Sequence, residues 1–591
     1  AKYLWQKVLE SAWQSADPGT QYDTTINEWH TCPFDGRING SNPCSEYMFL
    51  DNTACNLASL NLLSFYNSQT KEFDTKKFIH ATRLWTMVLE FSILMAHLPT
   101  KKVAEQTYLY RTLGLGYGNL GALLMQQGIP YESEKGYAIT AAISALMGGE
   151  AYATSAEMAK VTGAFDRFES NKDSMLKVIR NHRRAIYSAQ NNEYEELSIK
   201  PMGIDYSLAP QELVTSARIA WDHALTLGEE YGYKNAQTTL IAPTGTISLI
   251  MDFDTTACEP DFALVKFKKL VGGGYFKIVN QSVKPALEVL GYSETQADEI
   301  EKYIVGHSTL KSAPYINWET LKAKGFTERE LMALEGRMEG LYALNFAFSA
   351  FTLGEDFCMN VLKMTEAQIK DSSFNILKHI GFSDSEIEAA EEYVVGTMTI
   401  EGAPYLKEEH YSVFDCANKC GKKGKRYIST MGHLKQMAAA QPFLSGAISK
   451  TVNLPEDASL KDINDAYIEG WKLMLKAVAL YRDGSKLSQP LNSTSMDSAY
   501  SALFSFENDQ DEVPTEVNVV NAQQAIQQQL AGAPRRRKLP DERHSLTHKF
   551  SVGGHEGYIT VGLFEDGTPG EIFITMSNEG SFLYGIMDAF A

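Results

Sequence analysis

The stretch that decides the fold is Ser41-Asn-Pro-Cys-Ser-Glu-Tyr-Met-Phe-Leu-Asp-Asn-Thr-Ala-Cys-Asn-Leu-Ala-Ser59. It places a carboxamide (Asn42), a thiol (Cys44) and a carboxylate (Glu46) at every second position. Pro43 keeps itself and the residue before it out of a helix, so we predict an extended strand here. Side chains alternate along a strand, so the amide, the sulfur and a potential general base would face one substrate.

A second thiol, Cys55, follows Cys44 at a distance that allows the chain to turn and bring it back. Taken alone, Cys44 would be a buried structural thiol, because free cysteine is often simply buried. Glu46 alone would be a surface carboxylate. The coincidence of all these groups with Asn42 is hard to attribute to packing, so the motif predicts catalysis.

A second informative motif is Ala242-Pro-Thr-Gly-Thr-Ile-Ser248. A Gly/Thr turn that enters a helix leaves backbone N–H groups unpaired, and the hydroxyls of Thr244, Thr246 and Ser248 would lie beside them. Such an arrangement suits a phosphate group. The alternative is an ordinary helix cap, since caps are commonly built from Ser and Thr.

Composition excludes several classes of protein. The chain has 591 residues, so we expect a large main domain and at least one appendage. A net charge of −19 argues against a nucleic-acid-binding surface, and no apolar run reaches the roughly 18 residues of a membrane span. Seven cysteines are too few for a secreted disulfide framework, so we expect a reducing cytoplasm. Cys416 and Cys420 lack two further zinc ligands nearby and are interpreted as structural thiols; we predict no metal site.

The organisation predicted along the chain has three parts. Residues 1–490 alternate amphipathic helices and short apolar strands, typical of an α/β catalytic domain with helical insertions at about 265–410. Residues 491–544 are rich in Ser, Asp and Gln and read as a flexible linker. Residues 545–591 alternate as in a small β-rich module. Neither terminus looks natural, so we expect a piece of a longer protein or one part of a protein made in parts.

Three segments carry more local predictions. Lys77 to Leu98 has apolar residues at helical spacing and predicts a core helix. Arg111 to Gly121 is rich in glycine, which indicates close backbone packing in preference to nucleotide binding. Residues 291–315 resemble residues 381–405 at an offset of ninety, and both copies open with a capping-box pair, Ser293 with Gln296 and Ser383 with Glu386. Thr327 with Glu330 looks like a third helix start, so we interpret this region as duplicated helical insertions with a structural role.

The 41–59 stretch resembles the active-site loop of ribonucleotide reductases, most closely those of the adenosylcobalamin-dependent class. The further motifs that look like this family are Asp17-Pro-Gly19, Trp29-His-Thr-Cys-Pro33, Pro243-Thr-Gly-Thr-Ile-Ser248, Gln441-Pro-Phe-Leu-Ser-Gly446, Tyr481-Arg-Asp-Gly-Ser485, the Gly553-Gly-His-Glu-Gly557 turn and the ending Met587-Asp-Ala-Phe590. The resemblance spans nearly the whole chain except the linker.

This resemblance implies an α/β fold, a ten-stranded barrel of which this chain holds the radical-cysteine loop and the second half. Cys44 would carry the thiyl radical that abstracts the ribose 3′ hydrogen, Glu46 would take the 3′-hydroxyl proton, and Asn42 would hydrogen-bond the sugar. Cys55 matches one member of the cysteine pair that supplies two electrons. The substrate-binding residues implied in this way are Ser41, Asn42, Pro43, Cys44, Ser45, Glu46, Pro243, Thr244, Gly245, Thr246, Ile247 and Ser248.

Other expectations follow from the resemblance. The cofactor would be adenosylcobalamin, and the partners a ribonucleotide (a diphosphate in preference to a triphosphate), nucleoside triphosphate effectors and a thioredoxin-like electron donor. The first half-barrel and the C-terminal cysteine pair are missing, so we expect that this chain needs a missing N-terminal segment or partner chain. The alternatives are the large subunit of a di-iron-dependent reductase, a glycyl-radical enzyme, for which no terminal motif is seen, or a non-catalytic regulatory paralogue.

Overall fold

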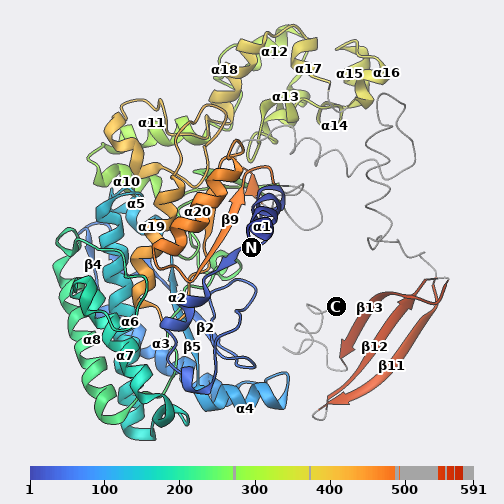
Figure 1. Cartoon of the computed structure of the whole chain (residues 1–591). Helices are drawn as coiled ribbons and strands as arrows, with labels where there is room; N and C mark the ends of the chain where they lie inside the picture. The colour runs from blue at the N-terminus through green and yellow to red at the C-terminus, as the bar shows by residue number, and fades with distance from the viewer. Residues whose placement is uncertain are drawn as a thin grey trace. The chain divides into compact units, whose positions relative to one another are not determined.

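The computed structural model describes residues 1–269, 275–371, 374–485, 491–492, 543–552, 555–564 and 566–576 (Figure 1). The chain divides into two compact units, residues 1–507 and residues 508–591. In the described part of the chain, no helix is both long and apolar enough to cross a membrane.

A row of parallel segments forms the centre of the first unit. β2 (Asn56–Asn61) and β5 (Leu113–Gly118) pair in parallel along their whole length. Parallel bridges then connect β5 to residues 238–241, and those to residues 446–449. Every residue of β5 is buried, as expected for a parallel strand covered on both faces.

The row leads on to a smaller sheet. β9 (Ala477–Arg482) pairs in parallel with β8 (Thr451–Leu454) and antiparallel with β1 (Thr20–Gln21). Helices α1 (Lys2–Ser15) and α20 (Leu460–Lys472) contact each other and β9. The chain's first residues therefore pack against residues more than 450 positions later in the sequence.

One long helix organises the helical layer beside the strands. α6 (Glu134–Thr162) is rich in alanine and is buried on all sides, which is typical of a central helix. α3 (Thr75–Met95), α8 (Gln211–Tyr231) and α19 (Thr430–Ala440) pack against it, and α7 (Phe168–Ile186) packs on α8 (Figure 1).

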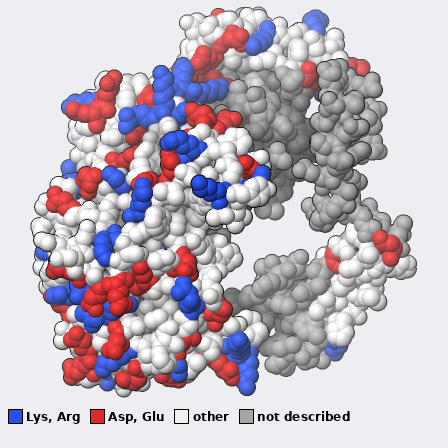
Figure 2. Space-filling view, viewed as in Figure 1, with Lys and Arg blue, Asp and Glu red and all other residues white. Residues whose placement is uncertain are grey.

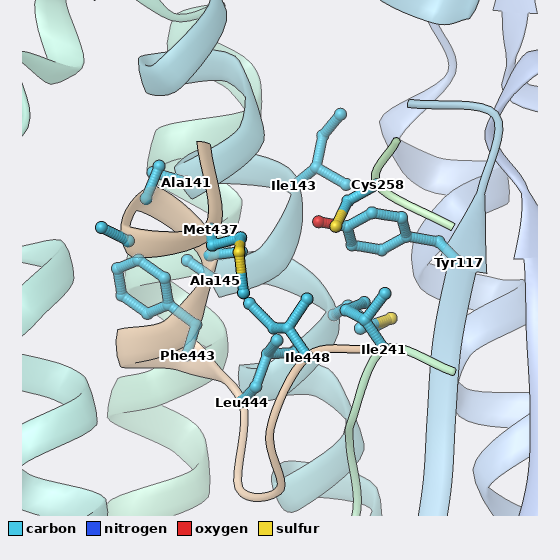
Figure 3. Packing of buried hydrophobic residues seen from close by; sticks show 14 of the residues in the cluster. Tyr117, Ala141, Ile143, Ala145, Ile241, Cys258, Met437, Phe443, Leu444 and Ile448 are labelled. Atoms are coloured by element: carbon cyan, nitrogen blue, oxygen red, sulfur yellow. The ribbon is translucent and has the colours of Figure 1, made fainter. Parts of the chain in front are cut away.

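The main hydrophobic core lies where this layer meets the strands. Figure 3 shows Ala141 and Ala145 of α6 facing Phe443 and Met437, with the ring of Tyr117 beside the strands. Small residues on α6 let neighbours approach closely: a Cβ at Gly148 would lie 2.3 Å from the carbonyl oxygen of Phe443.

The glycine-rich stretch 111–121 serves close packing, as predicted. A Cβ at Gly116 would lie 2.5 Å from the carbonyl oxygen of Leu240, and one at Gly118 would lie 2.0 Å from the ring of Phe253. The backbone of β5 can therefore approach segment 238–241 at Gly116, and the ring of Phe253 at Gly118, only because these positions carry no side chain.

The predicted helix between Lys77 and Leu98 is confirmed as α3, but its predicted burial is only partly correct. Phe78 and Leu89 are buried, whereas Leu84, Trp85 and Val88 are exposed. Helical spacing identifies an apolar face but cannot say whether this chain itself covers that face.

Residues between 263 and 420 form a second hydrophobic core. Its strands are β6 (Val265–Lys269) and β7 (Tyr275–Val279), and β10 (Leu491–Asn492) pairs with β6. Its helices are α10 (Val283–Val289), α11 (Glu294–Val305), α12 (Trp318–Ala323), α13 (Glu328–Glu335), α14 (Ala350–Leu353), α15 (Glu355–Asn360), α16 (Glu366–Lys370), α17 (Ile376–His379) and α18 (Asp384–Val394). The three predicted capping boxes are confirmed at the starts of α11, α13 and α18.

The two sequence repeats pair with each other about a pseudo-twofold axis. The N–H groups of His307 and Ser308 in the first repeat donate to the carbonyls of Tyr393 and Val394 in the second. The equivalent bonds run the other way: the N–H groups of Thr397 and Met398 donate to the carbonyls of Tyr303 and Ile304. On this axis, Nζ of Lys277 donates to the equivalent carbonyls of Val305 (3.0 Å) and Val395 (3.2 Å). One lysine thus caps the ends of both repeated helices.

Lys277→Met is expected to destabilise the chain by about 1–3 kcal/mol, because two carbonyls lose their donor. Burial lowers the pKa of Lys277 to about 8. At pH values between this pKa and the roughly 10.4 of an unfolded chain, the unfolded state binds more protons than the folded state. The free energy of unfolding of the wild type should therefore rise with pH relative to that of the variant. Denaturant unfolding at several pH values measures both effects, with the exposed Lys370→Met as control; equal unfolding free energies for Lys277→Met and wild type would contradict this role.

The described residues of the second unit form one antiparallel sheet of β11 (Ser545–Val552), β12 (His555–Leu563) and β13 (Pro569–Met576). The predicted β-rich module is therefore confirmed for these residues. The predicted linker begins at Leu491, which lies in β10. Residues 493–542 of that linker and residues 577–591 of the module lie outside the described residues, and the domain boundaries stay a prediction.

Candidate active site

The Cys44 loop, residues Ser41–Tyr47, is a turn. The carbonyl of Asn42 accepts a hydrogen bond from the N–H of Ser45 (3.0 Å), and its Oδ1 accepts one from the N–H of Tyr47 (3.0 Å). The predicted extended strand is therefore wrong: Pro43 favours the second position of a β-turn as readily as it favours a strand. The Asn42 side chain folds back onto its own loop and does not share a strand face with the thiol and the carboxylate.

Long-range contacts hold this loop in place. Nε2 of Gln21, on β1, donates to the hydroxyls of Ser41 (2.6 Å) and Ser45 (3.1 Å). The carbonyl of Glu46 accepts a hydrogen bond from the N–H of Ala447 (2.8 Å). The loop is thus attached both to β1 and to the parallel segment 446–449.

The carboxylate of Glu46 lies close enough to the thiols of Cys44 and Cys55 to affect their pKa values. Glu46 is 2% exposed, and its Oε2 has no hydrogen-bond partner among the described residues. Burial, together with the nearby Glu46 carboxylate, raises the pKa of the Cys44 thiol. The same two causes raise the pKa of Cys55 well above its usual range. Both sulfurs are therefore held as neutral thiols.

The two thiols differ in access. Cys44 is exposed, whereas Cys55 is half-buried at the start of β2. A Cβ at Gly114 would lie 2.8 Å from the sulfur of Cys55, so the glycine in β5 makes room for this thiol. The glycine-rich motif therefore contributes to the site, a role that the sequence analysis did not assign to it.

The hydroxyl of Tyr47 links the Cys44 loop to Thr53 and Thr112. It lies 2.7 Å from the hydroxyl of Thr53 and 2.8 Å from that of Thr112, the residue before β5. Burial raises the pKa of Tyr47, so this group stays protonated and can donate. These bonds fix the path between the two thiols.

The loop 242–248 lies at the carboxyl end of segment 238–241, where parallel sheets commonly bind ligands. Thr244 has φ of 56°, and its hydroxyl accepts a hydrogen bond from the N–H of Ala257 (2.8 Å). The hydroxyl of Ser248 donates to the carbonyl of Gly245 (2.9 Å). Two of the three predicted phosphate-binding hydroxyls therefore hold the loop itself, while Thr246 is exposed at the start of α9 (Ile247–Ile250).

Segment 446–449 joins this loop to the Cys44 loop. The N–H of Ala447 donates to Glu46, and its carbonyl accepts from the N–H of Ile241 (3.0 Å), the residue just before loop 242–248. A Cβ at Gly446 would lie 2.9 Å from the carbonyl oxygen of Glu46. The only sequence signal for this connection was the Gln441–Gly446 motif.

A buried ion pair anchors the chain after loop 242–248. Nζ of Lys450 lies 2.7 Å from Glu259 and donates to Nδ1 of His433 (2.7 Å). The other Glu259 oxygen accepts from the N–H of Thr451 (2.8 Å). Burial and the adjacent lysine hold the pKa of His433 well below its usual range, which keeps its Nδ1 available as an acceptor.

All seven cysteines are free thiols. Cys258 packs beside the ring of Tyr117 (Figure 3), and Cys358, Cys416 and Cys420 belong to the second core. Across the described ranges, no group of three or more His, Cys, Asp or Glu side chains is arranged to hold a metal ion. On the face of the first unit seen in Figure 2, acidic and basic side chains are interspersed.

Curated relatives resemble this chain over its whole length. The vitamin B12-dependent ribonucleotide reductase of Agrobacterium fabrum is 54% identical over all of this chain and 46% of its own length. The enzyme of the same name from Bradyrhizobium diazoefficiens is 52% identical over all of this chain and 47% of its own length. The class Id ribonucleotide reductase alpha subunit of Actinobacillus ureae aligns with a TM-score of 0.45 and 15% identity, over 82% of this chain and 61% of that one.

The chain thus spans about half the length of these two curated relatives. The family model for the ribonucleotide reductase barrel domain matches residues 1–324 and 359–481, which include the Cys44 loop, loop 242–248 and segment 446–449. The chain therefore belongs to the ribonucleotide reductase family and carries part of its α/β barrel.

Proposed function

We propose that this chain is the catalytic part of an adenosylcobalamin-dependent ribonucleotide reductase, which converts ribonucleotides to 2′-deoxyribonucleotides. The observation that carries the proposal is the buried carboxylate of Glu46. Its Oε2 has no hydrogen-bond partner in the described part of the chain, and burial together with this carboxylate raises the pKa of two thiols, Cys44 and Cys55. The names of the B12-dependent relatives support the same activity.

The proposed roles follow from access and protonation. The sulfur of Cys44 abstracts the ribose 3′ hydrogen, and the unpartnered oxygen of Glu46 accepts the 3′-hydroxyl proton. A base must be able to accept a proton without first breaking another bond, and Glu46 meets this condition. The Oδ1 of Asn42 is engaged by the N–H of Tyr47, so only its Nδ2 hydrogens are proposed to hydrogen-bond the sugar.

Electrons and atoms balance with one further thiol. The 2′-hydroxyl leaves as water, and the two electrons come from Cys55 and a second cysteine that a missing segment supplies. The two thiols become a disulfide, which a thioredoxin-like donor then reduces. A raised pKa suits Cys55 for this role because the thiol keeps its hydrogen until the substrate accepts it.

The residues present fit a radical source that lies outside this chain. Cys44 is exposed, so a large group can reach its sulfur. Adenosylcobalamin supplies an unpaired electron when its cobalt–carbon bond breaks homolytically. The role of this chain is to hold Cys44 in a turn that Gln21 and Ala447 fix by hydrogen bonds, with the carboxylate of Glu46 near the thiol.

The substrate is proposed to be a diphosphate bound at loop 242–248. Space around Gly245 is open, and the adjacent Thr246 is exposed. Nucleoside triphosphate effectors and a cytoplasmic location complete the proposal.

A second barrel segment is proposed to cover one side of the first unit. In the described part of the chain, β2 pairs only with β5. On α3, Leu84, Trp85, Val88 and Phe91 are exposed. An edge strand presents unpaired backbone groups, and an exposed apolar helix stripe is typical of an interaction surface, so both features favour a missing N-terminal segment or partner chain here.

Reconstitution tests the proposal. The chain would be mixed with the part of the Agrobacterium fabrum reductase that it does not cover, together with adenosylcobalamin, a ribonucleoside diphosphate and a dithiol. We expect deoxynucleotide only in the mixture, and a paramagnetic signal that requires both cofactor and nucleotide. Turnover by the isolated chain would refute the proposal that a further segment is needed. Dependence on an iron subunit instead of cobalamin would refute the proposed class of reductase.

Matched tryptophan variants locate the interface in the same assay. Trp85→Glu on α3 should reduce turnover of the mixture, because it places a charge on the proposed contact face. Trp471→Glu on α20, exposed to a similar degree (44% against 42%), should leave it unchanged.

A further inference from the structure

A small cavity with polar and apolar lining residues lies next to Met48 and Phe49, which follow the Cys44 loop. Its volume is about 10 Å³, and its lining includes Trp29, His30, Gln237, Ser445 and Lys476. A cavity of roughly this size holds one water molecule when polar partners surround it.

Three lining residues have donors or acceptors that no described residue of the chain satisfies. Nε1 of Trp29 and Oε1 of Gln237 are buried and have no partner among the described residues. Burial lowers the pKa of Lys476 to about 7. In its protonated form, Nζ of Lys476 has three hydrogens, of which two go to the carbonyls of Ser445 (2.8 Å) and Gly446 (2.9 Å). All three side chains belong to residues that are at most 3% exposed.

The other polar groups of the cavity are satisfied. Nδ1 of His30 accepts from the N–H of Cys32 (3.3 Å), so its Nε2–H donates to the carbonyl of Gly36 (3.1 Å). Burial lowers the pKa of His30 to about 4, so the ring is neutral. The hydroxyl of Ser445 accepts from the N–H groups of Thr238 and Thr239.

The donors of Trp29 and Lys476 and the acceptor of Gln237 determine which ligand can bind in the cavity. Two N–H donors and one carbonyl acceptor need an atom that accepts twice and donates once. A metal cation would meet the donors, and an anion would meet the carbonyl oxygen of Gln237. Water satisfies all three groups.

Lys476 is also connected to the Cys44 loop. It holds the carbonyls of Ser445 and Gly446, and the next N–H, that of Ala447, donates to the carbonyl of Glu46. We propose that Trp29, Gln237 and Lys476 bind one internal water, and that Lys476, held by it, is a positioning residue for Glu46. This inference rests on the proposed function only in taking Glu46 as the base.

A crystal structure of the full chain tests the water directly. We expect density about 2.7–3.2 Å from Nε1 of Trp29, Oε1 of Gln237 and Nζ of Lys476. A dry cavity, or a direct bond between Trp29 and Gln237, would overturn the proposed water site. This measurement needs no variant.

Alkylation of Cys44 tests the positioning role. Burial and, to a smaller extent, the Glu46 carboxylate raise the pKa of this thiol, so displacement of Glu46 should increase the thiolate fraction. In Lys476→Met we expect the pH profile of Cys44 alkylation by iodoacetamide, followed by peptide mass spectrometry, to shift to lower pH. The rate at pH 7.5 should rise severalfold.

Companion variants separate positioning from general damage. Lys472→Met, a half-exposed lysine on α20, should leave the profile unchanged. Gln237→Leu removes the water's acceptor, together with the Nε2 donor to the carbonyl of Leu113 (3.3 Å), and should shift the profile in the same direction by less. Lys476→Arg should restore part of the wild-type profile. A folded Lys476→Met with the wild-type profile would overturn the role; if it does not fold, an unshifted Gln237→Leu would do so. No readout depends on reductase activity, so an inactive chain would refute the proposed function alone.

Discussion

Replacing Cys44 with serine is expected to reduce deoxynucleotide formation by the reconstituted enzyme at least about a thousandfold. An O–H bond is stronger than an S–H bond, so a serine at this position cannot form the radical that abstracts the 3′ hydrogen. The paramagnetic signal described above should disappear together with the activity. Product analysis by chromatography and electron paramagnetic resonance measure the two effects.

The structure predicts that this loss is chemical. Cys44 is exposed and contributes little to packing, so Cys44→Ser should unfold at the wild-type denaturant midpoint. Cys358→Ser is the matched control: this thiol is buried in the second core, so the change should lower stability and preserve activity. Retention of more than a tenth of the activity by Cys44→Ser would remove the thiyl radical from the mechanism.

Glu46→Gln is expected to lower kcat by about 10²–10⁴-fold, the usual contribution of a general base. The same change should leave the free energy of unfolding unchanged or raise it, because Oε2 of Glu46 is buried without a partner. A variant that is inactive yet at least as stable would show that folding tolerates this carboxylate for the sake of function. Steady-state kinetics and denaturant unfolding on one preparation measure both quantities.

Glu259→Gln provides the contrast. Its carboxylate is paired with Lys450 and with the N–H of Thr451, so neutralising it should cost about 1–3 kcal/mol of stability. If Glu46→Gln is destabilised to the same extent, the carboxylate has a structural partner and our assignment of it as a base fails. Near-normal kcat in Glu46→Gln would contradict the assignment independently.

Much of the site could be predicted because its chemistry is local in sequence. Cys44 and Glu46 lie two residues apart, and the capping boxes of α11 and α18 depend only on residues three apart. The close packing around Gly114 and Gly116 was also predicted, because glycines in a strand indicate a close backbone approach.

The failures have a common physical cause. The stretch 42–46 was predicted as a strand, but its actual partners are Gln21 and Ala447, and the latter lies about 400 residues away. The helical spacing of α3 was correct, yet nothing in that spacing could show that Trp85 is 42% exposed. Propensity describes the backbone options of a segment, and tertiary contacts choose among them.

The sequence by itself determined which groups are available: two thiols, a carboxylate and an amide in one short stretch, with a Thr/Gly turn later in the chain. Only the tertiary structure decided that Glu46 is buried with an oxygen unused, that Cys44 is exposed and that Cys55 lies behind Gly114. The physical reason is that burial and pKa depend on what packs against a group, and here the packing residues come from β5 and segment 446–449, far away in the sequence.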